Sequence, residues 1–154
     1  DVNTLHVLPH WTFPGREGEV TPVYCYTNAP SAELFVNGKS QGRIVKNPDT
    51  RLDRYRLRWN NVKYEPGELK VVAYNYDGSV MGEKVVRTAG EPARIVLEAD
   101  RSSISSKGED LAFVKVSVVD KDGTPVVEGT KQGKATLSVS AEGLPKETLS
   151  INIK

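Results

Sequence analysis

The sequence lacks several features that mark particular classes of protein. Its 154 residues contain one cysteine, Cys25, so no disulfide bond can form within the chain. No apolar run approaches the roughly 18 residues of a membrane-spanning helix, and no charged-then-apolar leader of the secretory kind stands at the start. The 21 lysines and arginines nearly balance 20 aspartates and glutamates. This balance argues against binding to nucleic acid or to a membrane surface, because such proteins carry a basic excess.

Motifs of catalytic and metal chemistry are missing as well. Neither histidine, His6 or His10, has around it the spaced cysteine, histidine or acidic residues of a zinc site. There is no phosphate loop, dinucleotide fingerprint or nucleophile elbow, and the acids form no candidate pair for glycoside cleavage. Asp120–Gly123 holds two acids of a calcium loop but is more typical of a hairpin turn. We therefore expect no catalytic residue, no metal and no cofactor.

The pattern that is present is that of short antiparallel strands. Ala32, Leu34 and Val36 occupy every second position, as in a strand with one buried face. Asn37–Gly38 follows at once, and both residues accept positive φ at low cost. This pair predicts a two-residue hairpin turn with a returning strand over Lys39–Val45.

Seven strands are expected before Ala89, and no helical period interrupts them, which predicts an all-β fold and an antiparallel β-sandwich. Pro22 lacks an N–H, so an edge or a bulge is expected there. Cys25 is expected to be a structural thiol rather than a reactive one. The expected ranges are Thr4–Leu8, Glu19–Thr27, Ala32–Val36, Lys39–Val45, Arg54–Trp59, Glu68–Tyr76 and Ser79–Thr88.

The strand expected over Arg54–Trp59 alternates arginines with apolar residues. We expect Tyr55, Leu57 and Trp59 to face inward and the arginines to face water, near acids such as Asp53. The alternative is that the arginine row binds an anion.

A change of composition after Gly90 predicts a domain boundary. Phe113 is the only aromatic residue beyond position 90. We expect two consecutive β-sandwich domains, an accessory domain over residues 1–90 and an incomplete immunoglobulin-like domain over 91–154. Four strands in about 64 residues make only half a sandwich, with one sheet face bare. These strands are expected over Ile95–Ala99, Leu111–Asp120, Lys134–Ala141 and Thr148–Ile153.

The loop His10–Phe13 is the candidate functional element because it carries two aromatic residues. Aromatic faces stack on the apolar C–H surface of sugar rings, so His10, Trp11 and Phe13 are candidates for contact with carbohydrate. The alternative is that Trp11 and Phe13 anchor the loop on the sandwich or on a neighbouring domain.

Four stretches together resemble the C-terminal accessory region of glycoside hydrolase family 2 enzymes, and most closely that of β-galactosidases of gut Bacteroidetes. They are LHVLPHWTFPGREGEVTPVYCYTN, AELFVNGKSQGR, YRLRWNNVKYEPGELKVVAYNYDG and RTAGEPARIVLEADRSSISSKGEDLAFVKVSVVDKDG. The resemblance implies that the catalytic barrel, with its two catalytic glutamates, lies upstream of Asp1, so no catalytic residue is carried over. It also implies that His10 and Trp11, which match the family's Pro-His-Trp segment, lie near the active-site rim.

The chain departs from the family after its Asp-Lys-Asp-Gly-x-Pro turn. In the family this turn is followed by residues that supply the middle strands, whereas here Pro125–Gly129 leads almost directly to the last strands. Either the natural chain is short here, or a segment near 124–129 is missing from this sequence. We expect the second, with a spatial break between about Thr124 and Gly129. Because the sequence begins at Asp1 without Met, we also expect it to be a piece of a longer protein.

Three hypotheses for function follow. The first is a non-catalytic scaffold that packs on the catalytic barrel of the same chain, in a periplasmic or secreted glycoside hydrolase. The second is a carbohydrate-binding module with Trp11, Phe13 and Tyr64 as stacking residues. The third, suggested by residues 91–154, is an adhesin-like domain that binds a protein partner. The expected partners are thus the barrel and a glycan, without nucleic acid or a membrane span.

Overall fold

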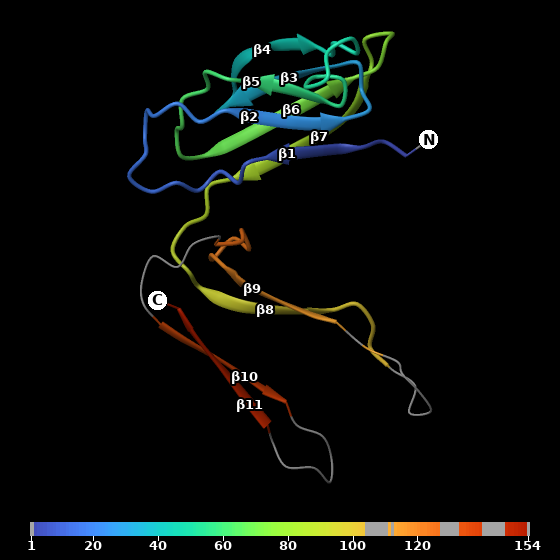
Figure 1. Cartoon of the computed structure of the whole chain (residues 1–154). Helices are drawn as coiled ribbons and strands as arrows, with labels where there is room; N and C mark the ends of the chain where they lie inside the picture. The colour runs from blue at the N-terminus through green and yellow to red at the C-terminus, as the bar shows by residue number, and fades with distance from the viewer. Residues whose placement is uncertain (1, 104–110, 112, 127–132, 140–146, 154) are drawn as a thin grey trace.

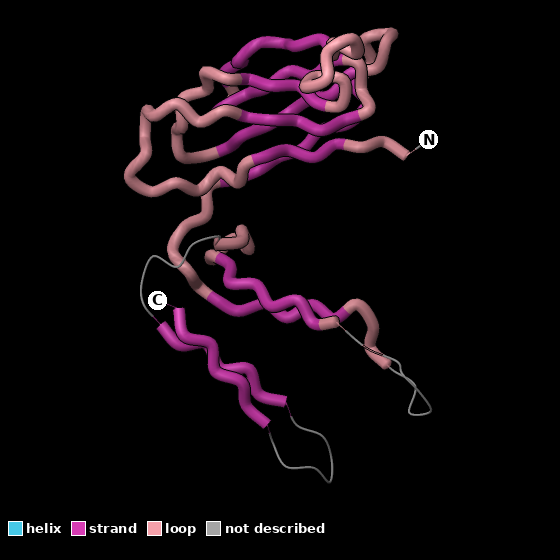
Figure 2. The backbone as a smooth tube through the Cα atoms, in the orientation of Figure 1, coloured by secondary structure: helices cyan, strands magenta, loops and turns pink. Residues whose placement is uncertain are grey.

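The computed structural model describes residues 2–103, 111, 113–126, 133–139 and 147–153, which form strands, turns and loops without a helix (Figures 1 and 2). All strand pairs are antiparallel. The expected all-β fold is confirmed. The strands are β1 (Leu5–Leu8), β2 (Val23–Thr27), β3 (Ser31–Val36), β4 (Lys39–Val45), β5 (Arg56–Trp59), β6 (Glu68–Tyr74), β7 (Val80–Arg87), β8 (Arg94–Ala99), β9 (Val114–Val119), β10 (Gly133–Val139) and β11 (Glu147–Ile153).

Strands β1–β7 form a sandwich of two sheets. One sheet has the order β1-β2-β5 and the other β4-β3-β6-β7 (Figure 1). The seven strands expected before Ala89 are all present. The core between the sheets is filled by large side chains that are at most 1% exposed, among them Trp11, Leu34, Leu57, Tyr64 and Leu69.

The period of two residues decides which side chains enter this core. In β2, Val23 and Cys25 are buried, while Tyr24 and Tyr26 are half-buried on the outer face of the sheet. β3 follows the same alternation, as predicted, and its buried apolar residues are Ala32, Leu34 and Val36.

The turn after β3 joins the hairpin to β6. Asn37 and Gly38 both have positive φ, 48° and 78°, which confirms the predicted turn. The Asn37 carboxamide donates from Nδ2 to the Pro66 carbonyl at 3.0 Å, and its Oδ1 accepts from the Glu68 N–H at 2.8 Å. Asn37 therefore fixes the start of β6 as well as the end of β3.

β4 is an edge strand with an irregular register. Glu33 pairs with Arg43, but Phe35 pairs with Ser40, so β4 contains a bulge at this point. The Trp59 indole N–H crosses from the other sheet and donates to the Gly42 carbonyl in the bulge at 2.9 Å. The bulge is thus held in place by a core residue of β5.

Two strand predictions need correction. The strand expected from Glu19 begins only at Val23, because Pro22 interrupts it and leaves Val20 in an isolated bridge with Lys63. Tyr55 was expected to face inward but is 70% exposed. The reason is that β5 begins at Arg56, so Tyr55 belongs to the preceding turn segment and its ring lies beside the Arg54 guanidinium.

In the described residues after Gly90, the chain has two antiparallel strand pairs, β8–β9 and β10–β11. One face of β8–β9 carries Ile95, Leu97, Val114 and Val116, which are between 44% and 53% exposed. The expectation that residues 91–154 form half a sandwich stays a prediction. The predicted break between Thr124 and Gly129 falls largely on residues 127–132, which lie outside the described residues, so it stays a prediction.

Candidate functional site

The loop His10–Phe13 is anchored in the sandwich through Trp11. The Trp11 side chain is fully buried, and its indole N–H donates to the Glu65 carbonyl at 2.9 Å. The ring meets that of Tyr64 edge-on, with the centroids 5.1 Å apart. An edge-on contact is a favourable arrangement for two aromatic rings. Trp11 therefore closes one end of the core.

The same loop is fastened to the segment by which the chain leaves the sandwich. Thr88, directly after β7, donates its hydroxyl to the Trp11 carbonyl. The Ala89 N–H donates to the Thr12 hydroxyl at 2.9 Å. The loop after β1 and the exit from β7 are thus one hydrogen-bonded unit, although 77 residues separate the partners.

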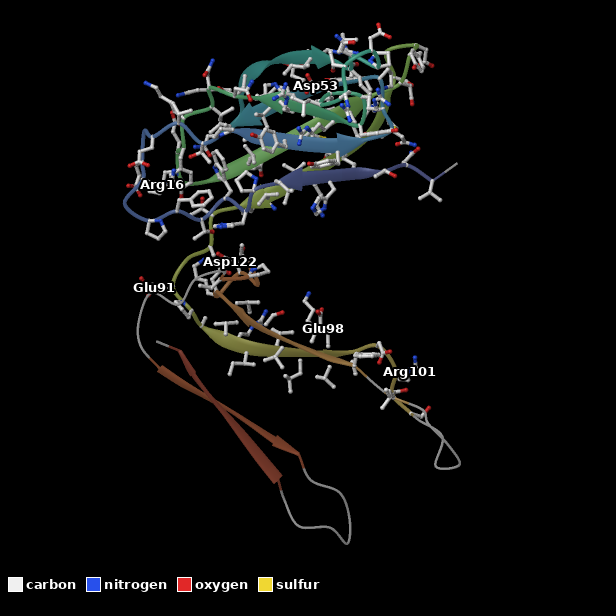
Figure 3. The ribbon with its side chains drawn as sticks, viewed as in Figure 1. Arg16, Asp53, Glu91, Glu98, Arg101 and Asp122 are labelled. Carbon is white, nitrogen blue, oxygen red and sulfur yellow. The ribbon has the colours of Figure 1, made fainter. Side chains whose placement is uncertain are left out.

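These contacts bear on the expected carbohydrate contacts. Trp11 and Tyr64 are at most 1% exposed, so neither ring offers a face to a sugar, and the stacking role expected of them is wrong for this structure. Phe13 is half-buried between the His10 ring, 4.3 Å away between centroids, and the Arg16 guanidinium, 5.2 Å from its centroid. Figure 3 labels Arg16 on this long loop. A sugar contact by His10 or Phe13 stays a prediction.

A groove of about 470 Å³ lies beside the loop, where the sandwich meets the turn after β9. His10 lines it from the loop, Lys84 and Arg87 from β7, and Asp122 and Pro125 from the turn. Arg87 is already paired with Glu68 at 2.7 Å. Asp122 is likewise paired with Lys121 at 2.6 Å. The groove therefore adds one imidazole and one ammonium group to a largely apolar lining, and its lining residues do not include the two facing acids that glycoside cleavage requires.

Asp120 joins the two sides of this groove, and sequence reasoning identified only its turn. Its Oδ2 accepts from the Gly90 N–H at 2.8 Å, while Oδ1 accepts from Asp122 N–H and Thr124 N–H at 2.9 and 2.8 Å. The Gly90 hydrogen bond is the main reason that the pKa of this carboxyl lies below its ordinary value. The Asp-x-x-Gly pattern indicates such a turn, but nothing local indicates Gly90 as the partner.

We expect the attachment at Gly90 to weaken in acid. Because the folded state lowers the pKa of Asp120, its stabilising contribution is complete above the ordinary carboxyl pKa of about 4 and is lost as the pH falls through the lowered value. Amide hydrogen exchange of Gly90 should accelerate relative to the core amides below pH 4. Asp120→Asn should show the faster exchange already at pH 6, whereas Asp77→Asn, in a distant turn, should leave Gly90 unchanged. Protection of Gly90 that is independent of pH would contradict the prediction.

The remaining reactive side chains have structural partners. Cys25 is buried, and burial raises the pKa of its thiol to about 11, so it is protonated at neutral pH, as expected of a structural thiol. Asp53 accepts from Nε and Nη2 of Arg58, so an acid that was expected to lie near the arginine row is paired with one of its members. Within the described ranges, no three histidine, cysteine or acidic residues are placed to hold a metal ion. No helix in those ranges could cross a membrane.

Residues 18–82 match a family model described as a domain of unknown function, DUF4982. The chain is 43% identical over 153 residues to the β-galactosidase BoGH2A of Bacteroides ovatus, which covers 94% of this chain and 17% of the relative. It is 39% identical over 92 residues to a putative β-glucuronidase of Formosa agariphila, covering 59% of this chain and 8% of the relative. The chain thus spans less than a fifth of the curated relatives it matches.

Solved structures show the same arrangement of strands. A glycosyl hydrolase family 2 member from Bacteroides cellulosilyticus superposes with a TM-score of 0.70 at 25% identity, over 98% of this chain and 29% of that one. A β-glycosidase from Bacteroides vulgatus gives a TM-score of 0.72 at 23% identity, over 99% and 25%, and supports the fold.

Fold and site together define a β-sandwich in which, among the described residues, Trp11, Asp53 and Asp120 have partners within the chain. The matches extend this description: the chain is an accessory region of the kind found in glycoside hydrolase family 2 enzymes of Bacteroidetes.

Proposed function

We propose that the chain is a non-catalytic part of a family 2 glycoside hydrolase and supports the catalytic barrel of the same polypeptide in carbohydrate degradation. The observation that carries this proposal is that the chain is 43% identical to a β-galactosidase while spanning only 17% of it. The groove beside His10 adds support, because its lining offers one carboxylate, Asp122, rather than a facing pair.

The proposal includes a division of labour along the chain. Residues 1–90 would be the sandwich that packs on the barrel, and residues 91–154 would be a second, immunoglobulin-like domain, attached through the hydrogen bond between Gly90 and Asp120. By analogy with secreted degradative enzymes, the parent protein would work in the periplasm or outside the cell. Which sugar it cleaves would be decided by the barrel.

Two measurements test the scaffold. The purified chain should not hydrolyse nitrophenyl β-galactoside or β-glucuronide above the buffer rate. Deleting residues 1–154 from the parent enzyme should lower the unfolding temperature of its catalytic domain. Hydrolysis by the isolated chain, or a deletion that leaves the catalytic domain equally stable, would reject the scaffold.

A second candidate function is a contact with carbohydrate at the rim of the active site. It is favoured by the groove of about 470 Å³ that His10 lines. His10→Ala and Phe13→Ala should then raise the KM of the parent enzyme for a long oligosaccharide while leaving that for a nitrophenyl glycoside unchanged. Equal KM values for both substrates in both variants would remove this candidate.

A further inference from the structure

The outer face of the sheet β1-β2-β5 has more positive than negative side chains. Asp53 is engaged with both Nε and Nη2 of Arg58. Arg56 has no carboxylate within ion-pair distance among the residues that the structure describes, and Arg54 likewise has none there. On the other sheet Lys70 pairs with Glu83 and Arg87 with Glu68, each at 2.7 Å, while Lys84 of β7 lies at the groove beside His10.

The Arg56 guanidinium is held in one position by its contacts. Its Nε donates to the Leu52 carbonyl at 2.8 Å and its Nη1 to the Tyr26 hydroxyl at 3.2 Å, and the group lies 5.4 Å from the centroid of the Tyr24 ring. Within the described part of the chain, no partner is found for Nη2. An arginine fixed in this way is prepared to receive an anion, because little side-chain entropy remains to be lost.

Two tyrosine rings stand beside this arginine. Tyr24 and Tyr26 occupy the outer positions of β2 and are opposite Arg58 and Arg56 in the sheet register. Both rings are half-buried, which leaves each of them an accessible part. Residues two apart on a strand are about 6.6 Å apart along it, so the two rings are neighbours on the outer face of the sheet, and their accessible parts with the hydroxyl tips are called the tyrosine platform here. The Arg56 guanidinium lies over the Tyr24 ring at one end of this platform.

A hollow of about 220 Å³ adjoins the arginines at the edge of the sandwich. Its polar lining comes from Asn47, Asp53, Arg56, Arg58 and Asn60, and Ile44 contributes apolar surface. Figure 3 labels Asp53 at this side of the sandwich. Carboxamide and carboxylate groups that converge on a small hollow are suited to bind hydroxyl groups.

We propose that this face binds an acidic saccharide, with the sugar carboxylate on Arg56, the ring on Tyr24 and Tyr26, and hydroxyl groups in the hollow beside Asp53. A guanidinium binds a carboxylate through charge-assisted hydrogen bonds, and the tyrosine platform distinguishes a sugar from a simple inorganic anion. The site lies on a different face from the His10 loop and does not rest on the proposed scaffold function.

The test is a titration of the isotope-labelled chain with tetragalacturonic acid, followed by amide chemical shifts. The expected result is saturable shifts in β2 and β5, which weaken with added salt. Carboxyl-reduced galactotetraose should bind with an affinity at least about tenfold lower, since a hydrogen bond to a charged group is lost.

Four variants separate this site from general attraction of anions. Arg56→Gln and Tyr24→Ala should each weaken binding about tenfold, while Lys70→Gln removes one positive charge from the other sheet and should leave the affinity unchanged. Arg56→Lys keeps the charge but cannot form the paired hydrogen bonds of a guanidinium, so it should also weaken binding, and it replaces Arg56→Gln as the test if that variant does not fold. The proposal is overturned if no saturable shifts appear, or if Lys70→Gln weakens binding as much as Arg56→Gln does. It is also overturned if tetraglutamate gives the same shifts, which would indicate an acidic protein partner instead.

Discussion

Replacing Trp11 with alanine is expected to lower the free energy of unfolding of the sandwich by about 3–5 kcal/mol. The side chain is fully buried, so its removal leaves a cavity and also leaves the Glu65 carbonyl without its indole donor. Chemical denaturation followed by the fluorescence of the remaining Trp59 measures the change.

His10→Ala is the matched control for this prediction. His10 is the neighbouring loop residue and is half-buried, so its truncation should cost within about 0.5 kcal/mol if it is not part of the core. The loss of unfolding free energy caused by Trp11→Phe should lie between those of Trp11→Ala and His10→Ala, because phenylalanine restores part of the ring but not the indole N–H. A Trp11→Ala protein as stable as His10→Ala would show that the loop does not close the core.

Replacing Gly67 with alanine should be nearly as damaging. Gly67 has φ of +130°, a conformation that other residues rarely adopt, and a Cβ there would meet the Asn37 carboxamide oxygen. The clash would displace Asn37 and break its hydrogen bonds to Pro66 and Glu68. We expect a loss of about 2–4 kcal/mol in unfolding free energy.

Two further variants separate the clash from the backbone strain. Gly78 also has positive φ, +85°, but no atom lies within 4 Å of its added Cβ, so Gly78→Ala should cost only about 1–2 kcal/mol. On an Asn37→Gly background, Gly67→Ala should cost less than in the wild type, because the carboxamide is gone. Equal costs for Gly67→Ala in both backgrounds would exclude the clash as the cause.

The local sequence pattern was sufficient to predict the features that depend on residues close together in the sequence. The alternation through Ala32–Val36 and the turn at Asn37–Gly38 follow from a few consecutive residues, and both were predicted. The nearness of Asp53 to the arginine row was expected as well, and the pairing of Arg58 with it spans only five positions. Tyr55 was misplaced because alternation alone does not say at which residue a strand begins.

The features that the sequence did not reveal depend on partners far along the chain. The burial of Trp11 requires Tyr64 and Glu65, and its hydrogen bond spans 54 positions. The bond from Gly90 to Asp120 spans 30. A single sequence contains no signal for such distant contacts, so it left open whether Trp11 contacts carbohydrate or anchors the loop, and the structure places its side chain in the core.

The bulge in β4 has a consequence for behaviour at high concentration. An unpaired, regular edge strand can serve as a template on which a second copy adds its own strand. Here the ladder is broken opposite Glu33 and Phe35, and one of the carbonyl groups in the bulge is already occupied by the Trp59 indole. At high concentration, β4 would therefore not offer a regular strand edge to which further copies of the sandwich could add and form a fibril.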